Sequence, residues 1–137
     1  MGARGKKPQA ALSVVKPGTV SAVERPAAPS ELTDEQAAEW ESIVDRMPAD
    51  WFPRETHGML AQYCRHVVAA RRVAQMIVSL EKGELDTIDW IGDFDKLLKM
   101  QEREGRAMSS LATRMRISQQ AQYSHKKKTG TGAKKPF

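Results

Sequence analysis

The chain has one cysteine, few aromatic residues and no long apolar segment, and each shortage excludes a class of protein. Cys64 stands alone among 137 residues, which rules out an internal disulfide and a thiolate metal cluster. Phe, Trp and Tyr together make up 6% of the residues, too few for a large single core. No apolar run approaches the length of a membrane span, and none follows the basic residues near the N-terminus. We therefore expect neither membrane insertion nor secretion.

Acidic residues are absent from the last part of the chain, so charge is distributed unevenly. Residues 1–30 carry five Lys or Arg and one Glu, and residues 31–113 carry ten Lys or Arg and sixteen Asp or Glu. Residues 114–137 carry seven Lys or Arg and no acid. An acidic centre thus lies between two basic ends. Basic ends favour a polyanionic partner, of which nucleic acid is the commonest; the alternative is that they only aid solubility.

Motifs of the common enzyme classes are also missing. The sequence has no HExxH, no GxSxG, no glycine-rich phosphate loop and no His/Cys spacing typical of a metal site. Cys64 lies in an apolar helical pattern and is expected to be a packed thiol rather than a nucleophile. His57 and His66 are expected to be structural or surface residues. An acidic helix start, or alternatively a weak metal site, explains the carboxylates of Asp89, Asp93 and Asp95. We expect no enzymatic activity and no cofactor.

The first predicted helix begins at a capping box and ends before a proline. Thr33 and Gln36 can exchange hydrogen bonds at its start, and the proline that opens the segment PADWFP stops it. Residues 1–30 are rich in Pro and Gly and show no sustained apolar period, so we expect a flexible arm there. Trp51 and Phe52 are expected to plug the junction with the next helix, with a stacking platform for bases as the alternative.

Two longer helices are expected to form an antiparallel hairpin, with the first helix packed across its end. The second should run from about Pro53 to Glu81, and the third should follow the loop KGELDTID. The apolar face of the second comprises Leu60, Tyr63, Cys64, Val67, Ala70, Ala74 and Val78. The stripe of the third comprises Trp90, Ile91, Phe94, Leu97, Leu98, Gln101, Met108, Leu111, Ala112 and Met115.

Gly105 lies on the stripe of the third helix, where it either permits close helix approach or marks a break. A second helix of this length suits an antiparallel hairpin or an oligomer better than a compact monomer. We therefore predict an all-α fold in which residues 31–117 form a helical oligomerisation core. Residues 1–30 form a basic arm before this core, and residues 118–137 form a disordered basic tail after it.

Basic side chains recur along both long helices. At helical spacing, Arg54, Arg65 and Arg72 form a ridge away from the apolar stripe, whereas Arg71 falls near the apolar face and needs a partner if buried. On the third helix, one face carries Lys96, Lys99, Arg103 and Arg106. Such ridges suit salt-sensitive contacts with phosphates. The alternative is a solvated face paired with acids of neighbouring helices.

The candidate nucleic-acid-binding residues come from both ends of the chain and from these helices. They are Arg4, Lys6, Lys7, Arg54, Arg65, Arg72, Arg114, Arg116, Lys126, Lys127, Lys128, Lys134 and Lys135.

Three segments, taken in order, resemble a known family. Residues 32–47 read LTDEQAAEWESIVDRM, residues 48–77 read PADWFPRETHGMLAQYCRHVVAARRVAQMI, and residues 109–118 read SSLATRMRIS. Over about residues 31–124 the chain resembles the small terminase subunits of tailed bacteriophages. In that family, a helix of the type that holds Tyr63 and Cys64 leads through a short loop to another helix. That helix has a Ser-rich, Arg-containing end, which is matched here by Ser109, Ser110, Arg114 and Arg116.

The chain departs from many relatives because EGRAMSSLATRMR contains no proline, so we expect the third helix to continue further. The resemblance implies a non-enzymatic packaging factor of the host cytoplasm. Small terminases form rings through helical hairpins, recognise viral DNA, and recruit or regulate the large subunit, which holds the ATPase and nuclease. The implied partners are therefore double-stranded viral DNA, the large terminase subunit and further copies of the chain. The alternative is a general nucleic-acid-binding helical oligomer without a packaging role.

Overall fold

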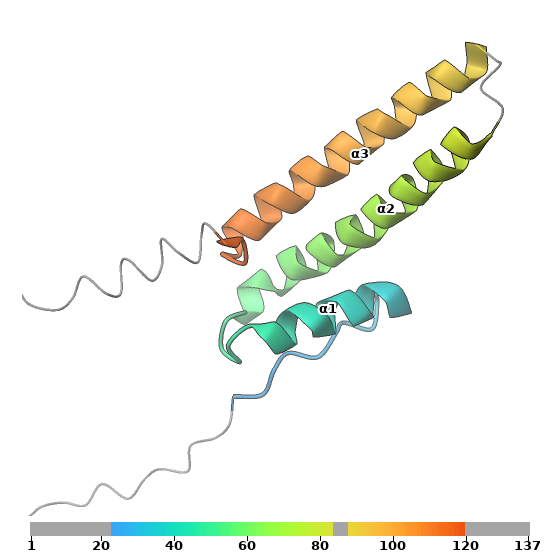
Figure 1. Ribbon diagram of the computed structural model, residues 1–137. Helices are drawn as coiled ribbons and strands as arrows, with labels where there is room; N and C mark the ends of the chain where they lie inside the picture. Colours follow the sequence, from blue (N-terminus) through green and yellow to red (C-terminus); the bar gives the residue numbers. More distant parts are fainter. Residues whose placement is uncertain (1–22, 84–87, 120–137) are drawn as a thin grey trace, which may run out of the picture.

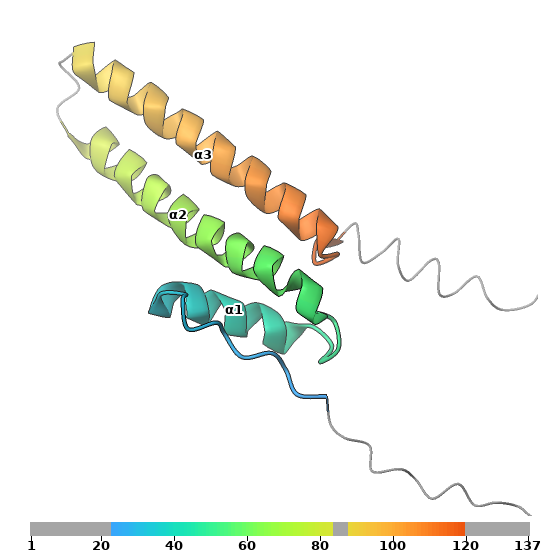
Figure 2. The ribbon, with the colours of Figure 1, turned by 180° about the vertical axis from the view of Figure 1, so that it is seen from behind.

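The computed structural model describes residues 23–83 and 88–119, which form an all-helical fold with no strand among them. The helices are α1 (Asp34–Arg46), α2 (His57–Lys82) and α3 (Ile88–Arg114), and a short 3-10 turn, η1 (Arg54–Thr56), precedes α2. In Figure 1, α2 lies between α1 and α3, and the view from behind shows the same order (Figure 2). The all-α prediction is confirmed.

Helix α1 begins at the predicted capping box and is closed at its other end by an arginine from the preceding segment. The Thr33 hydroxyl accepts from the Gln36 amide at 3.4 Å, and the Gln36 side chain accepts from the Thr33 amide at 3.1 Å. The Arg25 guanidinium donates to the carbonyls of Val44 and Met47, where the helix leaves acceptors without intrahelical donors. Both ends of α1 are therefore capped by side chains.

Residues 23–30, which we expected to belong to the flexible arm, pack along α1. Besides the Arg25 contacts, the indole N–H of Trp40 donates to the Pro26 carbonyl at 2.9 Å. These contacts join side-chain donors to backbone carbonyls. Because such contacts produce no repeating apolar pattern, the sequence did not predict that this segment packs on α1. The remainder of the expected arm, residues 1–22, and of the expected tail, from residue 120, lies outside the described residues.

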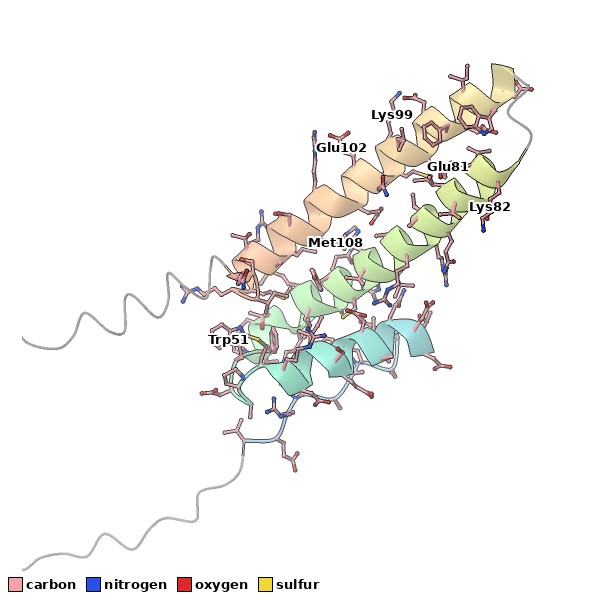
Figure 3. The ribbon with its side chains drawn as sticks, in the orientation of Figure 1. Trp51, Glu81, Lys82, Lys99, Glu102 and Met108 are labelled. Atoms are coloured by element: carbon pink, nitrogen blue, oxygen red, sulfur yellow. The ribbon has the colours of Figure 1, made fainter. Side chains whose placement is uncertain are left out.

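The main core lies where α1, the junction and the two ends of the hairpin meet. Trp40, Leu60 and Cys64 are fully buried there, and Phe52 and Met115 are buried beside them. Each large side chain buried in this way contributes about 1.5–3 kcal/mol. Trp51 packs against the same cluster, and Figure 3 shows it at the junction, near the end of α3. The prediction that the two aromatics plug the junction is confirmed.

Helices α2 and α3 form the expected antiparallel hairpin, held by apolar and polar contacts. Leu97 and Ile77 are buried along it, and the Trp90 indole donates to the Leu80 carbonyl at 3.1 Å near its tip. Further along, His66 Nδ1 lies 2.5 Å from Glu104 Oε2, and both side chains are largely buried. His66 therefore has a structural role in the hairpin, which is one of the two alternatives expected for it.

The single apolar face predicted for α2 is wrong, because the helix packs on two sides. Leu60 and Cys64 are buried in one cluster with Trp40 of α1, whereas Ile77 is buried outside that cluster, in the distal part of the hairpin. Both views show α1 alongside only the first half of α2 (Figures 1 and 2). Several residues of the predicted stripes are consequently exposed, namely Ala74, Val78, Ile91, Leu98 and Gln101.

Gly105 does neither of the two things considered for it. Helix α3 runs unbroken from Ile88 to Arg114, as expected for a segment without proline. A Cβ atom built on Gly105 would meet no atom within 4 Å, so no neighbouring element of the described structure requires a glycine there. Met115, placed on the helical stripe from the sequence, is buried but lies just beyond the helix end.

Candidate nucleic-acid interface

The end of α3 is a left-handed cap formed by an arginine instead of a glycine. Arg116 has a φ of 58°, the left-handed region. Its amide bonds to the Thr113 carbonyl at 3.1 Å, and the Ile117 amide bonds to the Ala112 carbonyl at 3.0 Å. These two bonds define the Schellman motif, whose left-handed position is usually glycine. The chain therefore carries a long cationic side chain at a position where the backbone favours having none.

The junction brings three of the candidate arginines to one end of the molecule. The Trp51 indole donates to the Met115 carbonyl at 3.1 Å. Arg54 follows Trp51 closely in the chain, in η1, and Arg114 and Arg116 flank Met115. We call Arg54, Arg114 and Arg116 the basic end. All three side chains are exposed, and the chain continues from this end into a segment with five lysines and no acid.

The guanidinium groups of the basic end have no hydrogen-bond or ion-pair partner within residues 23–83 and 88–119. Asp50 and Glu55 also lie in the junction and are exposed, so the local field is mixed but contains more arginine than acid. Cationic groups that are exposed and unpaired remain available to phosphate oxygens.

Arg46 lies close to the residues that follow Arg116, although it was not among the candidates from the sequence. It lines a cavity of about 440 Å³ together with Tyr63, Ile117 and Ser118, and its guanidinium bonds to the Ser42 hydroxyl at 3.2 Å. The signal that could have identified it is its place in the last turn of α1, since that end of the helix meets the junction.

The other predicted ridge residues are paired across the seam between α1 and α2. Arg65 lies 3.6 Å from Glu31 and Arg72 lies 3.9 Å from Glu35. Arg71 is exposed and not buried on the apolar face, and its guanidinium pairs with Glu39 at 2.5 Å. The seam arginines thus match the alternative reading, a face whose charges are satisfied by neighbouring acids. Arg65 and Arg72 therefore differ from the arginines of the basic end, because each has an acidic partner in the same chain.

The cationic face of α3 is largely paired within its own helix. Lys96 pairs with Asp93, Lys99 with Asp95, and Arg106 with Glu102, all three or four residues apart. The hydrogen bond that the Lys99 ammonium donates to the Asp95 carboxylate raises the pKa of Lys99 above its usual value. Arg103 is the member of this face for which the described residues offer no acidic partner.

The remaining sequence candidates lie outside the described residues. These are Arg4, Lys6 and Lys7 near the N-terminus, and Lys126, Lys127, Lys128, Lys134 and Lys135 near the C-terminus.

Cys64 and His57, which were candidates for a chemical role, are packed against other parts of the fold. Burial raises the pKa of the Cys64 thiol to about 12, and the nearby Glu39 carboxylate adds to the shift, so this group is protonated at neutral pH. His57 Nε2 lies 3.1 Å from the Phe52 carbonyl, and its ring packs edge-on against Trp40. In the part of the chain that the structure describes, no three His, Cys, Asp or Glu side chains gather as metal ligands.

Over residues 23–83 and 88–119, none of the helices combines the length and apolarity needed to cross a bilayer.

The chain was compared with family models, curated proteins and solved structures, and none of the three comparisons gave a match.

Proposed function

We propose that the protein is a non-enzymatic, oligomeric DNA-binding adaptor of the small terminase kind. It acts in the host cytoplasm, where it binds viral double-stranded DNA and recruits or regulates a large subunit that carries the ATPase and nuclease. The packaging role rests on the resemblance of residues 31–124 to small terminases. The DNA-binding role rests on the basic end, and this is the observation that carries the proposal.

The basic end supports phosphate contact for three reasons. Its three guanidinium groups are exposed, and no carboxylate of the described residues pairs with them. Arg116 holds a left-handed conformation that disfavours a side chain, and such conformations persist preferentially at functional sites. The sequence that follows adds five lysines without an acid. Contacts of this kind bind DNA without reading its sequence.

The proposal is tested by titrating a labelled DNA duplex with the protein at several salt concentrations. Wild-type affinity should fall steeply between about 50 and 200 mM salt, because each phosphate contact releases counterions. The triple variant Arg54→Gln, Arg114→Gln, Arg116→Gln should show a slope of log K against log salt that is smaller by about 3, at roughly 0.9 per lost contact. An unchanged slope would contradict the proposal.

The seam arginines provide the matched control. The double variant Arg65→Gln, Arg72→Gln likewise removes guanidinium groups, here from α2. Unlike those of the basic end, these two arginines pair with acids in the same chain. It should leave the salt slope nearly unchanged and cost little stability, since exposed ion pairs contribute about 0–1 kcal/mol. A control that weakens binding as much as the triple variant would mean that net charge, and not the basic end, governs binding.

The packaging role needs a separate experiment with a candidate large subunit. The two proteins should co-purify, and the small protein should change the ATPase rate of the large one. DNA binding without either effect would favour the alternative, a general nucleic-acid-binding oligomer.

A further inference from the structure

The described chain begins and ends at the same end of the molecule. Its first residue is Val23 and its last is Gln119. In Figure 1 the start of the blue segment and the end of the red one both lie opposite the tip where α2 meets α3, and Figure 2 shows the same arrangement from behind. Residues 1–22 and residues 120–137 therefore join the helices at one common end.

Side-chain contacts hold the N-terminal segment at this end. The Arg25 guanidinium donates to the carbonyls of Val44 and Met47, at the end of α1, and the described chain begins two residues before it. Met47 lines the same cavity as Ile117 and Ser118, and the basic end immediately precedes Ile117 in the chain. Both terminal segments thus start from neighbouring surfaces beside the basic end.

Both terminal segments carry positive charge without any acid. Residues 1–22 contain four Lys or Arg, residues 120–137 contain five Lys, and neither segment contains Asp or Glu. Lys16, which was not among the candidates from the sequence, precedes Val23 by seven residues, and Lys126 follows Gln119 by seven. Seven residues span at most about 25 Å. Whatever path the chain takes, both lysines can reach phosphates that lie near the basic end.

The opposite end of the hairpin is acidic. Residues 81–99, which we call the acidic tip, contain six Asp or Glu and three Lys, and the acids of its described part are exposed. Figure 3 shows Glu81 and Lys82 near the tip and Trp51 at the other end.

The two ends are too far apart for their charges to cancel. The 26 residues of α2 span about 39 Å, several times the Debye length of about 8 Å at physiological salt. Each end therefore presents its own field to a partner. A polyanion is attracted to the end that carries the arginines and both basic segments, and it is repelled by the acidic tip.

We propose that residues 1–22, the basic end and residues 120–137 bind the same stretch of DNA, so that the chain meets the duplex end-on and the acidic tip points away from it. A duplex carries one negative charge per about 1.7 Å of its axis, so one that contacts the basic end brings many phosphates within reach of Lys16 and Lys126. The first contact makes the later ones intramolecular, which raises their effective concentration.

This inference rests on the proposed function and deepens it. It adds Lys16 to the phosphate-binding residues, and it assigns the N-terminal cations to the same DNA as the C-terminal ones. It also gives the bound chain an orientation.

The first experiment measures salt dependence on a short duplex. The full-length variant Lys6→Gln, Lys7→Gln, Lys16→Gln is titrated against a duplex of about 20 base pairs, which is about 68 Å long. Its slope of log K against log salt should be smaller than that of wild type by about 2.7, at roughly 0.9 per lost contact. The control Lys82→Gln, Lys96→Gln, Lys99→Gln removes the same charge from the acidic tip and should keep the wild-type slope.

The second experiment tests the orientation directly. Glu24→Cys and Glu81→Cys each replace one exposed acid, at opposite ends of the molecule, and each is labelled with an iron chelate that cleaves nearby DNA strands. Cys64 is fully buried and stays unlabelled. The label at residue 24 should cleave the bound duplex, whereas the label at residue 81 should not.

Several results would overturn the inference. An N-terminal variant with the wild-type salt slope would show that residues 1–22 do not contact this DNA, whatever else they bind. A control variant that loses as much slope would mean that net charge alone governs binding. Cleavage from residue 81 as strong as from residue 24, or cleavage from neither, would exclude end-on binding. Circular dichroism should show unchanged helix content in every variant.

Failure of this inference can be told apart from failure of the proposed function. A wild-type chain that binds no DNA rejects the DNA-binding role, and this inference with it. Salt-sensitive binding that depends on the basic end, combined with a wild-type slope for the N-terminal variant and no cleavage from residue 24, rejects this inference alone.

Discussion

The indole N–H of Trp51 donates a hydrogen bond to the backbone carbonyl of Met115, 3.1 Å away and 64 positions further along the chain. The other two tryptophans act in the same way: Trp40 donates to the Pro26 carbonyl and Trp90 to the Leu80 carbonyl. Each indole packs its ring against the fold and uses its one N–H donor to bond a backbone carbonyl of another segment of the chain. For Trp51 this segment is the end of α3, which carries Arg114 and Arg116 of the basic end.

Trp51→Phe should therefore loosen the end of α3 without unfolding the hairpin. The change retains a ring in the junction but leaves the Met115 carbonyl without its indole donor, which should cost about 1–2 kcal/mol of unfolding free energy. Urea unfolding followed by circular dichroism measures this cost. Hydrogen exchange should show faster exchange at residues 115–117 than in wild type.

Trp90→Phe is the matched control for this change. It removes the same kind of hydrogen bond at the opposite end of the hairpin, to the Leu80 carbonyl. It should lower stability by a similar amount but leave exchange at residues 115–117 unaltered. Equal exchange in both variants would mean that Trp51 does not hold the α3 end.

The sequence predicted the helices well, because capping and prolines are local signals. Thr33, Gln36 and Pro48 fixed α1, and apolar spacing identified both helices of the hairpin. It did not predict that α2 packs on two sides, because a face angle does not show how far a neighbouring helix extends. Val78 and Leu98 were consequently assigned to a core although they are exposed.

The candidate site was predicted less completely, since charge pairing depends on tertiary neighbours. Arg65 and Arg72 were treated as one ridge with Arg54, but Glu31 and Glu35 pair with them from the α1 side of the seam. The sequence also gives no sign that Arg116 adopts a left-handed conformation, because glycine is the usual residue at that position. The sequence likewise does not show that the Trp51 indole bonds to the Met115 carbonyl, which ties the junction that holds Arg54 to the end of α3.

Gly105→Ala should stabilise the protein. Gly105 lies inside α3 with space around a built Cβ, and alanine is favoured over glycine in a helix interior by about 1 kcal/mol. The urea midpoint should therefore rise without a change in slope. Gly92→Ala, which also meets no atom within 4 Å, provides the comparison. If Gly105→Ala alone is destabilising, a neighbouring subunit must approach the helix at that position.

Cys64 should resist thiol reagents in the folded protein. The side chain is fully buried, and burial raises the thiol pKa from 9.0 to about 12. At pH 8 the reactive thiolate is therefore a minute fraction of the folded protein. Labelling with iodoacetamide should be slow in native conditions and complete in urea. Rapid labelling of the native chain would show that the core opens readily.

The raised pKa of the Cys64 thiol also determines how the stability of the fold depends on pH. Because the folded state holds the thiol proton more tightly than the unfolded state, stability should be unaffected by this group below about pH 9. It should then decline as the pH rises from 9 toward 12, as the unfolded chain ionises first. Cys64→Ala should weaken this decline. Burial also raises the pKa of Tyr63, so part of the decline should persist in that variant.

Arg116→Gly should raise stability while weakening DNA binding. A left-handed backbone costs a residue with a side chain about 1–2 kcal/mol, which glycine avoids, so the unfolding free energy should rise by about 1 kcal/mol. The lost guanidinium should lower the salt slope of DNA binding by about 1. Arg114→Gly removes the same charge from the last residue of α3, where glycine lowers helix stability. The two variants should thus shift stability in opposite directions and DNA binding in the same direction. If Arg116→Gly leaves DNA affinity unchanged, the arginine at this cap does not contact phosphate, and DNA binding must depend on other basic residues.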